Sequence, residues 1–381
     1  MKSTKAKVLI FTDWYLPGYK AGGPIRSCAN LVHLLGDEID FKVVCLDHDY
    51  LETEPYANVL PNKWINVGKA DVWYISSDRL LQSTMKEIML DLSDYQVYIN
   101  GVFSKYFSVT PLIKANKLGR KITVAPRGML AEGALSIKPQ KKKAFLNLAK
   151  FLGLYRRVRF HATNADEANQ IKKEIARKAD IQVIPNLPSI PGKEAQRIEK
   201  HENSLKIISV ARIAREKNTA FALECFRNID SKFHVEINFV GTVYDSEYFS
   251  ECKIIADTLP ANVAVTFSGA MPSDSIAGLF AEAHLFFLPT LGENYGHAII
   301  ESLLNGLPVL ISDKTPWKNL QNDGLGVEMP LSEPSGFVNY ISQIAAMSQA
   351  DYDLKFSNLS EKAASRVHLK ENIEAYKLLF Q

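Results

Sequence analysis

Residues 284–313 read HLFFLPTLGENYGHAIIESLLNGLPVLISD, and this stretch decides the fold. The apolar run 285–288, closed by a proline and a threonine, predicts a buried parallel strand, and residues 295–305 predict a helix. Gly306 and Pro308 end that helix, and the next buried strand starts at 309–311. A strand–helix–strand unit places the helix N-terminus beside the carboxyl end of a strand. Ligands bind at that edge of open α/β sheets, and the free N–H groups there favour an anion.

Two glutamates mark the same place. Glu293 lies in the loop before the helix, where it could simply complement the helix dipole. Glu301 lies eight positions further on, between apolar residues of a helix flanked by buried strands. A carboxylate in such a position is either partnered or bound to hydroxyl groups. Sugar and ribose hydroxyls are suitable donors, because hydrogen bonds to a carboxylate are strong and directional.

The two glutamates belong to a longer pattern, PT-x-x-E-x-x-G…E-x-x-x-x-G-x-PV-x-x-SD. This pattern resembles the signature of the retaining GT-B glycosyltransferases of family 4, whereas the alternative is an ordinary strand–helix–strand unit. The resemblance implies an α/β protein with two Rossmann-like, doubly wound parallel-sheet domains that face a central cleft. It covers nearly the whole chain and is strongest over residues 205–313.

Composition agrees with two soluble domains. A chain of 381 residues has a two-domain length, and its net charge of +3 is too small to indicate nucleic acid. The four cysteines are scattered without a CxxC pair, which favours reduced thiols. No apolar run has the length of a membrane span, and the apolar run after the N-terminal lysines is too short for a signal peptide. We therefore expect a cytoplasmic protein.

Alternating strands and helices predict the domain organisation. The first domain is expected at 1–187, a polar linker at 188–204, the second domain at 205–365, and a helix at 366–381 that returns to the first domain as in other GT-B proteins. By resemblance, the first domain binds the acceptor and the second the nucleotide sugar. The predicted strands are 8–12, 41–46, 72–76, 96–100, 121–125 and 159–162 in the first domain, and 205–211, 235–240, 263–268, 285–288 and 309–311 in the second.

A glycine-rich loop follows the first strand, and Gly22 and Gly23 open the helix predicted at 25–35. A glycine pair at a helix start lets the backbone approach a phosphate or sugar closely, although such glycines are usually only turn residues. In family 4 this loop faces the donor diphosphate. Asp47-His48-Asp49 follows the second strand and looks like a metal-binding DxD motif of another glycosyltransferase fold; we interpret it as a solvated loop.

Two further strand ends carry polar residues, at Asn100-Gly101 and at Pro126-Arg127-Gly128-Met129. Family members often have H-x-H-G and P-R-G-M at these places. The arginine motif is intact, whereas Asn100 replaces the second histidine, so an imidazole contact to the acceptor is in doubt. Arg127 could meet a phosphate or an acidic acceptor, or it could anchor its loop.

Residues 133–165 contain no acidic residue. Their basic residues are Lys138, Lys141, Lys142, Lys143, Lys150, Arg156, Arg157 and Arg159. The apolar residues at helical spacing are Phe145, Leu148, Leu152 and Tyr155. A basic amphipathic helix can lie on an anionic bilayer, and the alternative is a packed helix with a solvated basic face. We favour contact with the inner membrane leaflet over nucleic acid.

Residues 209–217, SVARIAREK, end the strand that opens the second domain. They resemble the family element G-R-L-x-x-x-K, with Ala211 in place of glycine. Arg212 and Lys217 could converge on a diphosphate, one as a planar fork and the other as a mobile point charge. Arg215 matches no family role and can be a solvated charge. Ser268 and Gly269 end another strand, in a region that flanks the nucleotide in the family.

The resemblance implies a retaining, metal-independent hexosyl- or N-acetylhexosaminyltransferase that needs no cofactor and acts in surface polysaccharide or O-antigen synthesis. Its substrates would be a nucleotide-sugar donor, with a UDP-sugar expected first although the residues give no base preference, and a glycan or lipid-linked glycan acceptor. Glu293, Arg212 and Lys217 would act in catalysis, and Glu301 would hold the ribose. Further donor contacts are expected from Asn294, Tyr295, Gly296 and His297.

Two alternatives stay open. A GT-B epimerase or phosphorylase would share the fold but should lack the combination of the two glutamates with the Arg212–Lys217 loop. A nucleotide-sugar-binding or scaffold protein of a glycan assembly complex would bind the same ligand without turnover, and Asn100 mildly favours it.

Overall fold

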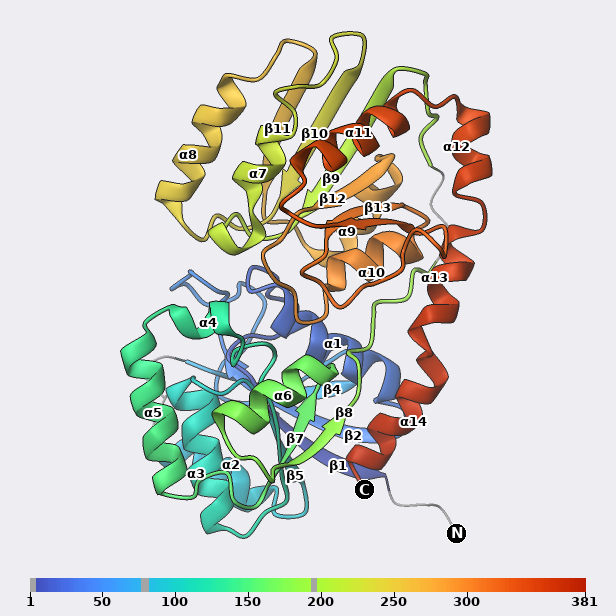
Figure 1. Cartoon of the computed structure of the whole chain (residues 1–381). Helices are drawn as coiled ribbons and strands as arrows, with labels where there is room; N and C mark the ends of the chain where they lie inside the picture. Colours follow the sequence, from blue (N-terminus) through green and yellow to red (C-terminus); the bar gives the residue numbers. More distant parts are fainter. Residues whose placement is uncertain (1–4, 77–81, 193–196) are drawn as a thin grey trace. The chain divides into compact units, whose positions relative to one another are not determined.

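The computed structural model describes residues 5–76, 82–192 and 197–381, which form two compact units (Figure 1). The first unit comprises residues 1–187 together with 369–381, and the second comprises 188–368. Each unit has its own sheet. Of the predicted linker 188–204, residues 193–196 lie outside the described residues, and Lys200 is buried in the second unit.

The described strands of the first unit form one sheet in the order β3-β4-β2-β1-β5-β6-β7-β8. Their bounds are β1 Ala6–Phe11, β2 Ile39–Leu46, β3 Trp64–Val67, β4 Ala70–Ile75, β5 Gln96–Asn100, β6 Ile122–Ala125, β7 Val158–Ala162 and β8 Asp180–Val183. The pairings are parallel except at one edge, where β3 runs antiparallel to β4 and Trp64 lies opposite Trp73. The parallel sheet is thus confirmed, and β3 is an edge strand that the sequence analysis missed.

Helices cover both faces of this sheet, because successive strand residues point to opposite sides. Val8 and Ile10 pack in one core with α1 and α14, whereas Leu9 and Phe11 pack in another with α2, α3, α5 and α6. The helices are α1 Gly23–Leu35, α2 Gln82–Asp91, α3 Thr110–Lys117, α4 Glu132–Ser136, α5 Pro139–Phe151, α6 Ala165–Glu174 and α14 Leu369–Leu379, with a π-helical turn, η2, at Lys105–Val109.

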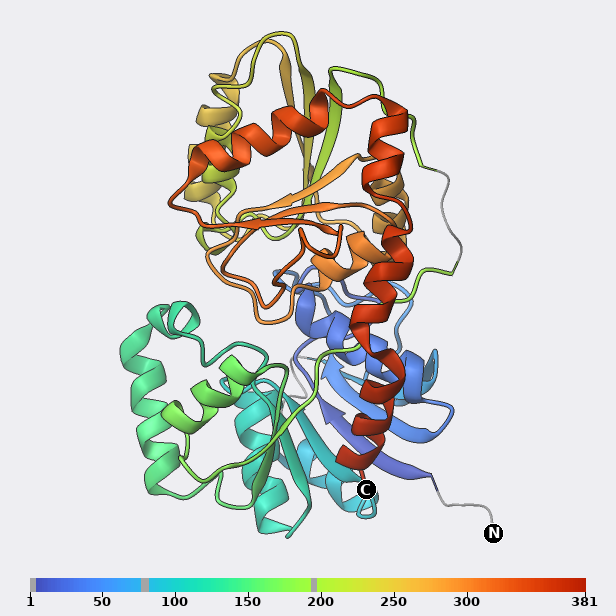
Figure 2. The same cartoon turned by 45° about the vertical axis from the view of Figure 1, so that its right-hand side comes forward.

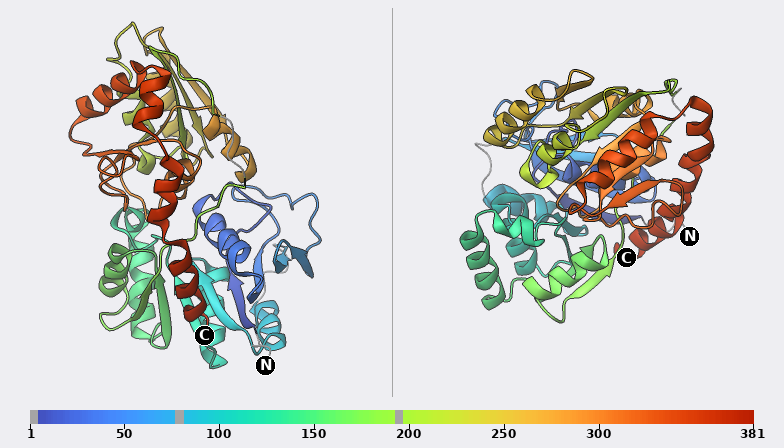
Figure 3. Two further views of the ribbon diagram at one scale, coloured as in Figure 1. Left: turned by 90° about the vertical axis from the view of Figure 1, so that its right-hand side faces the viewer. Right: turned by 45° about the horizontal axis from the view of Figure 1, so that its top comes forward.

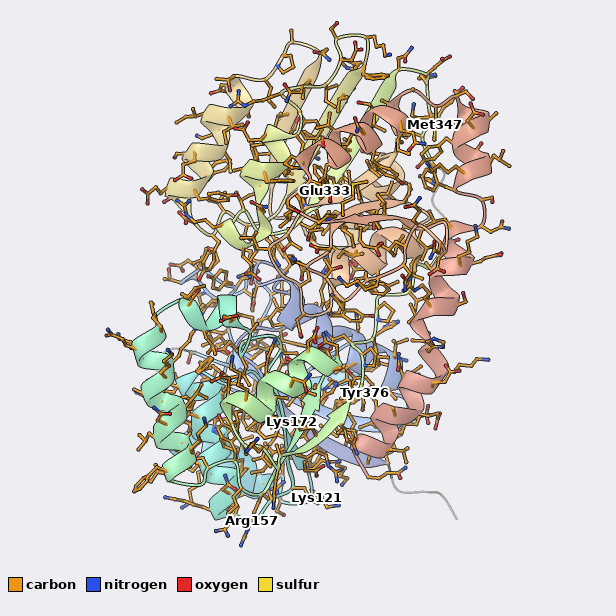
Figure 4. All side chains as sticks on the ribbon, viewed as in Figure 1. Lys121, Arg157, Lys172, Glu333, Met347 and Tyr376 are labelled. Atoms are coloured by element: carbon orange, nitrogen blue, oxygen red, sulfur yellow. The ribbon has the colours of Figure 1, made fainter. Side chains whose placement is uncertain are left out.

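The last helix of the chain, α14, completes the first core. Figures 1 and 2 show α14 beside the sheet of the first unit, and in the left view of Figure 3 it lies next to α1. Its residue Tyr376, labelled in Figure 4, is buried, and so are Leu379 and Phe380. The Phe380 ring packs edge-on against Phe41 and Tyr98, so the sheet needs this segment to bury its apolar face.

The second unit has a sheet of parallel strands in the order β11-β10-β9-β12-β13-β14. The strands are β9 Ser204–Val210, β10 His234–Val240, β11 Val263–Gly269, β12 Leu285–Leu288, β13 Val309–Ser312 and β14 Gly326–Met329. The helices are α7 Thr219–Glu224, α8 Ser246–Asp257, α9 Ser273–Ala281, α10 His297–Leu304, α11 Pro334–Ala345, α12 Gln349–Lys355 and α13 Leu359–Val367, with a 3-10 turn, η3, at Arg215–Lys217.

Neighbouring residues of β12 show that this sheet is also doubly wound. Phe287 packs against Phe226 and against Phe337 of α11, whereas Phe286 packs against Phe280 of α9. All residues of β12 and β13 are buried, as a parallel sheet covered on both faces requires. Among the described residues, no helix is long and apolar enough to cross a membrane.

A buried lysine near the start of the second unit forms hydrogen bonds to the carboxyl end of α11. The Lys200 ammonium donates to the carbonyl oxygens of His201 (2.7 Å), Ala345 (2.9 Å) and Met347 (3.0 Å). Ala345 is the last residue of α11, so the positive charge also lies at the negative end of the helix dipole. Burial lowers the pKa of Lys200 from its ordinary value of 10.5 to about 8.

We expect Lys200→Met to lower the free energy of unfolding by about 2–3 kcal/mol at pH 7, because three buried carbonyls lose their donor. Between pH 8 and 10.5 the unfolded wild-type chain binds more protons at this lysine than the folded chain does. Wild-type stability should therefore rise with pH relative to the variant over that range. Urea denaturation at pH 7 and pH 10 measures both effects. Lys206→Met, at an exposed lysine, is the control, and equal stability of the two variants would contradict the assignment.

Candidate functional site

The second unit has a switch in strand order between β9 and β12. From β9 the chain continues to β10 and β11 on one side, whereas β12 leads to β13 and β14 on the other side. The two strands that flank the switch pair in parallel, with Leu285 opposite Ile207. The loops after them therefore diverge at the carboxyl edge of the sheet, where open α/β sheets bind ligands.

The loops after β9 and β12 are joined through one carbonyl oxygen. Glu216 O accepts the Leu291 amide (2.8 Å) and the Thr290 hydroxyl (3.1 Å). The Ser312 hydroxyl at the end of β13 donates in turn to Thr290 O (2.5 Å). These bonds hold three strand ends at a fixed spacing.

Lys217 and Glu293 form an ion pair at this junction. The Lys217 ammonium lies 2.7 Å from Glu293 Oε1, and the two side chains are only 11% and 16% exposed. Lys217 is the last residue of the turn η3, and its amide donates to Ala214 O (2.9 Å). Two residues that lie 76 positions apart in the sequence thus meet in the fold.

The two arginines of the same loop differ in environment. Arg212 is half-exposed, lies 3.8 Å from a Glu216 carboxylate oxygen, and has its guanidinium 5.2 Å from the centre of the Tyr244 ring. Arg215 instead pairs with Glu251 (2.7 Å) on the surface. The Lys217 ammonium lies 3.6 Å from the same Glu216 carboxylate, so the fold brings Arg212 beside Lys217. It turns Arg215 toward α8.

The helix after β12 begins two residues later than predicted, at His297. Gly296 precedes it with φ of 78°, and its carbonyl accepts the amides of Ile299 and Ile300. A Cβ on Gly296 would lie 2.8 Å from Ile299 Cδ1, so glycine is required by both conformation and space.

Trp317 fixes this helix start, and the sequence analysis did not find it. Its indole N–H donates to Tyr295 O (2.6 Å), and its own amide is held by the Thr315 hydroxyl (3.2 Å). A threonine, proline and tryptophan shortly after the strand β13 were the sequence pattern that could have indicated this contact. The tryptophan thereby links the loop after β13 to the loop after β12.

The other predicted residues of the second unit lie in α10, in the loop before it and at the end of β11. Glu301 and His297 are buried in α10, and the His297 ring packs on Tyr295 with centroids 4.9 Å apart. Asn294 is half-buried in the loop before the helix. Ser268 donates to the Asn238 side chain (2.7 Å) at the end of β11.

The strand ends of β9, β10 and β11 are also tied together. Gly269 O accepts the Gly241 amide (2.8 Å), and a Cβ on Gly241 would lie 1.9 Å from Ala211 O. This close approach requires glycine at 241 and brings the loop after β10 against the residue before Arg212.

In the first unit, the Arg127 guanidinium forms hydrogen bonds to other side chains of the same unit. Its Nε donates to Asn100 Oδ1 (2.8 Å), Nη2 donates to the Tyr98 hydroxyl (2.7 Å), and Nη1 donates to Asn186 Oδ1. Asn100 is buried and donates to the Thr12 hydroxyl (3.2 Å) and to Pro24 O (3.3 Å). These bonds give Arg127 the loop-anchoring role that the sequence analysis left open, and substrate contact by Arg127 and Asn100 stays a prediction.

The arginine is also connected to α14. The Tyr98 hydroxyl lies 2.7 Å from His161 Nδ1, and His161 Nε2 lies 2.8 Å from Ile184 O and 3.3 Å from the Tyr376 hydroxyl. Burial, aided by the Arg127 charge, lowers the pKa of His161 to about 3. A neutral His161 can therefore accept from Tyr98 and donate to Ile184 O.

Gly22 and Gly23 lie where they were predicted, at the start of α1. Gly22 has φ of 68°, and added Cβ atoms at either glycine would meet nothing within 4 Å. Asp13, which the sequence analysis did not single out, lies directly beyond β1 and accepts from the Ser104 hydroxyl (2.6 Å). Burial raises the pKa of its carboxyl group. Among the described residues, no three His, Cys, Asp or Glu side chains are grouped as a metal site would need.

A family model matches most of the second unit. Residues 192–356 match the family model "Glycosyl transferases group 1". This match spans β9 to β14 and includes Arg212, Lys217, Glu293 and Glu301. No curated protein sequence matches the chain.

Structural comparison extends the likeness over both units. Sucrose-phosphate synthase from Thermosynechococcus elongatus has a TM-score of 0.71 at 15% identity, with 99% of this chain and 98% of that chain covered. HepE from Anabaena in complex with UDP and glucose has a TM-score of 0.64 at 15% identity (95% and 99% covered). WaaG, a glycosyltransferase involved in lipopolysaccharide biosynthesis, has a TM-score of 0.67 at 11% identity (98% and 99% covered). The chain therefore has the GT-B fold.

We expect Gly296→Ala to lower the free energy of unfolding by about 1–3 kcal/mol, because alanine must adopt a left-handed backbone and displace Ile299. Gly292→Ala in the same loop is the matched control, since its Cβ would meet nothing within 4 Å. Denaturant titration of the two variants measures the difference. Equal stability would show that the helix start tolerates a side chain.

Proposed function

We propose that this protein is a retaining glycosyltransferase that moves a hexosyl or N-acetylhexosaminyl group from a nucleotide sugar to a glycan or lipid-linked glycan. A UDP-sugar is the first donor to test. One observation carries the proposal. Lys217 and Glu293 are paired at 2.7 Å, beside Arg212, at the switch point of the second unit. A cation, a carboxylate and a helix N-terminus at one strand edge suit a ligand that has both phosphates and sugar hydroxyls.

The ion pair is compatible with diphosphate binding. An ammonium group has three donors, so Lys217 can keep Glu293 and still donate to phosphate oxygens. Arg212 supplies a planar fork that is exposed enough to turn toward the same anion. As the bond from the anomeric carbon to the phosphate oxygen breaks, these groups would stabilise the charge that grows on the leaving diphosphate.

The carboxylates have separate roles in this proposal. Glu293 would hold the donor-sugar hydroxyls, and the buried Glu301 would hold the ribose hydroxyls, with His297, Asn294, Ser268 and Gly269 beside the donor. In a same-face reaction the acceptor hydroxyl bonds to the anomeric carbon as the diphosphate leaves, and the leaving phosphate takes the acceptor's proton. No metal, cofactor or protein base enters this step, so Asn100 in place of the family histidine is compatible with turnover.

The comparisons support the class of substrates. HepE was solved with UDP and with glucose, and WaaG is involved in lipopolysaccharide biosynthesis. We therefore propose cytoplasmic synthesis of a surface polysaccharide as the setting. The second candidate, a binding or scaffold protein without turnover, differs in one measurable respect. An enzyme slowly releases free nucleotide from its donor in the absence of acceptor, and a pure binder releases none.

We expect Lys217→Met and Glu293→Gln each to lower kcat by about 100-fold or more, because each removes a charge next to the reacting bond. Nucleotide release from UDP-sugars, followed by a coupled assay, measures this rate. Arg215→Ala is the matched control from the same loop, and it should stay within about twofold of wild type because its surface ion pair contributes little. Near-normal rates for folded Lys217→Met and Glu293→Gln would refute the site, and a wild type without any release would favour the scaffold.

We also propose that α5 contacts the inner membrane leaflet. One face of α5 is buried through Leu146 and Ala149, yet a second apolar group is exposed, comprising Ile137, Leu148, Phe151 and Leu152. Phe151 is 85% exposed. Exposed cations lie in the same segment, namely Lys138, Lys141, Lys143, Lys150, Arg156 and Arg157. Exposed apolar residues together with exposed cations suit an anionic bilayer, into which the apolar side chains can insert.

The residues of this surface differ from those expected. Tyr155 is buried and Phe145 is half-buried in the core of the first unit, so the helical spacing of these aromatics belongs to packing. Leu148 and Leu152 are exposed as expected, and Phe151 and Ile137 join them.

We expect the double variant Leu148→Ser/Phe151→Ser to weaken binding to vesicles that contain phosphatidylglycerol by about 10-fold or more, because two inserted side chains are lost. Co-sedimentation measures the bound fraction. Leu354→Ser, which changes an exposed leucine of α12, is the control and should bind as wild type does. Absence of wild-type binding, or binding that the double variant retains in full, would refute the membrane contact.

A further inference from the structure

The Asp47-His48-Asp49 motif is part of the folded structure. The interpretation of this motif as a solvated loop is wrong, because Asp47 and Asp49 are only 3% and 6% exposed. Asp47 Oδ1 lies 2.9 Å from His48 Nδ1, within the motif itself. Asp49 instead bonds to another loop. A buried carboxylate is costly unless it is hydrogen-bonded, so its partners show what it holds in place.

Asp49 accepts three backbone hydrogen bonds. Its Oδ2 accepts the amides of Tyr19 (2.8 Å) and Lys20 (3.1 Å), and its Oδ1 accepts the amide of Tyr50 (2.7 Å). Tyr19 and Lys20 lie in the glycine-rich loop after β1, about thirty residues earlier in the chain. One carboxylate thus fixes a turn of the glycine-rich loop to the loop after β2.

Other contacts join the same two loops. The Trp14 ring packs edge-on against Tyr50 with centroids 4.9 Å apart, and Lys20 forms an ion pair with Glu52. Gly18 is enclosed between them, since a Cβ there would lie 2.3 Å from the Tyr56 hydroxyl and 3.0 Å from Asp49 Oδ1. The loop after β2 therefore forms a close-fitting support under the glycine-rich loop.

The turn held by Asp49 leads directly into the helix start. The Gly22 amide donates to Tyr19 O (3.0 Å), and Gly22 O accepts the amides of Ile25 (3.1 Å) and Arg26 (3.2 Å) in the first turn of α1. The position of Gly22 thus depends on Tyr19, whose own amide is bound by Asp49. Glycines at 18, 22 and 23 leave the free loop many conformations, and the carboxylate selects one of them.

We propose that Asp49 is a positioning residue that preorganises the glycine-rich loop for the sugar-transfer step. This inference rests on the proposed function together with the resemblance, which places the glycine-rich loop at the reacting centre. Hydrogen bonds from backbone amides to a charged carboxylate are the stronger kind, so they can hold a glycine-rich segment. A loop placed before substrate arrives spends no binding energy on ordering during turnover.

The test compares Asp49→Asn with Asp47→Asn, two isosteric changes at buried positions two residues apart. In Asp49→Asn the amide NH₂ group replaces one acceptor and faces a backbone N–H. We expect kcat to fall by about 10–100-fold, the scale of a small misplacement near the reacting bond. The shift in melting temperature on adding UDP should stay as in wild type, because the proposed donor groups Arg212, Lys217 and Glu301 belong to the second unit. Asp47→Asn should keep the wild-type kcat.

Hydrogen exchange of the peptide covering residues 14–24 provides a readout that does not depend on activity. Exchange should be faster in Asp49→Asn and unchanged in Asp47→Asn. Faster exchange with a wild-type kcat would overturn the inference, as would an equal loss of kcat in both variants. A wild type that releases no nucleotide from any donor would refute the proposed function instead, and the exchange result would still show whether Asp49 anchors the loop.

A second variant covers the case in which Asp49→Asn does not fold. Glu52→Ala removes the partially exposed ion pair of Lys20 with the same turn and leaves the carboxylate of Asp49 in place. We expect faster exchange over residues 14–24 and a decrease of about twofold in kcat, as the loss of a surface pair predicts. Faster exchange with unchanged kcat in this variant would also overturn the inference.

Discussion

The switch in strand order between β9 and β12 is the constraint on which the second unit depends. The loops after β9 and β12 leave the same edge of the sheet and continue to opposite sides of it. Glu216 O in the first loop accepts two hydrogen bonds from the second loop, and Lys217 lies 2.7 Å from Glu293. The α10 helix start is held separately, by the Trp317 indole on Tyr295 O, so the proposed site combines sheet topology with this side-chain contact.

Buried carboxylates hold the strand-end loops of the first unit in a similar way. Asp49 accepts three amides and fixes the loop after β1. Glu167 of α6 accepts the Gly128 amide (2.6 Å) after β6 and the Thr163 amide (2.7 Å) after β7. A carboxylate that is fully hydrogen-bonded to backbone amides avoids the cost of burial and orders segments with little apolar surface. Loops at this edge are therefore positioned by side chains that come from their neighbours.

In the proposed membrane contact, α5 would face two environments. Leu146 and Ala149 face the core, while Leu148 and Phe151 are exposed among lysines. Folding alone does not require an exposed Phe151, because the sheet below is already covered by the other face of the helix. The mixture of exposed apolar and basic side chains is what contact with an anionic bilayer needs.

The sequence by itself determined the parallel α/β architecture and the strands 285–288 and 309–311, because period and turn residues are local properties. Motif spacing also predicted Arg212, Lys217, Glu293 and Glu301 as site residues, and this stays a prediction. The sequence did not determine that Lys217 pairs with Glu293, that Arg127 is bonded within its own unit, or that Trp317 fixes the α10 start. It misjudged Asp49, since a short acidic loop looks solvated until its partners are known. Tertiary structure decided these points, because the hydrogen-bond partners lie 22 to 76 positions away in the sequence, which local patterns do not specify.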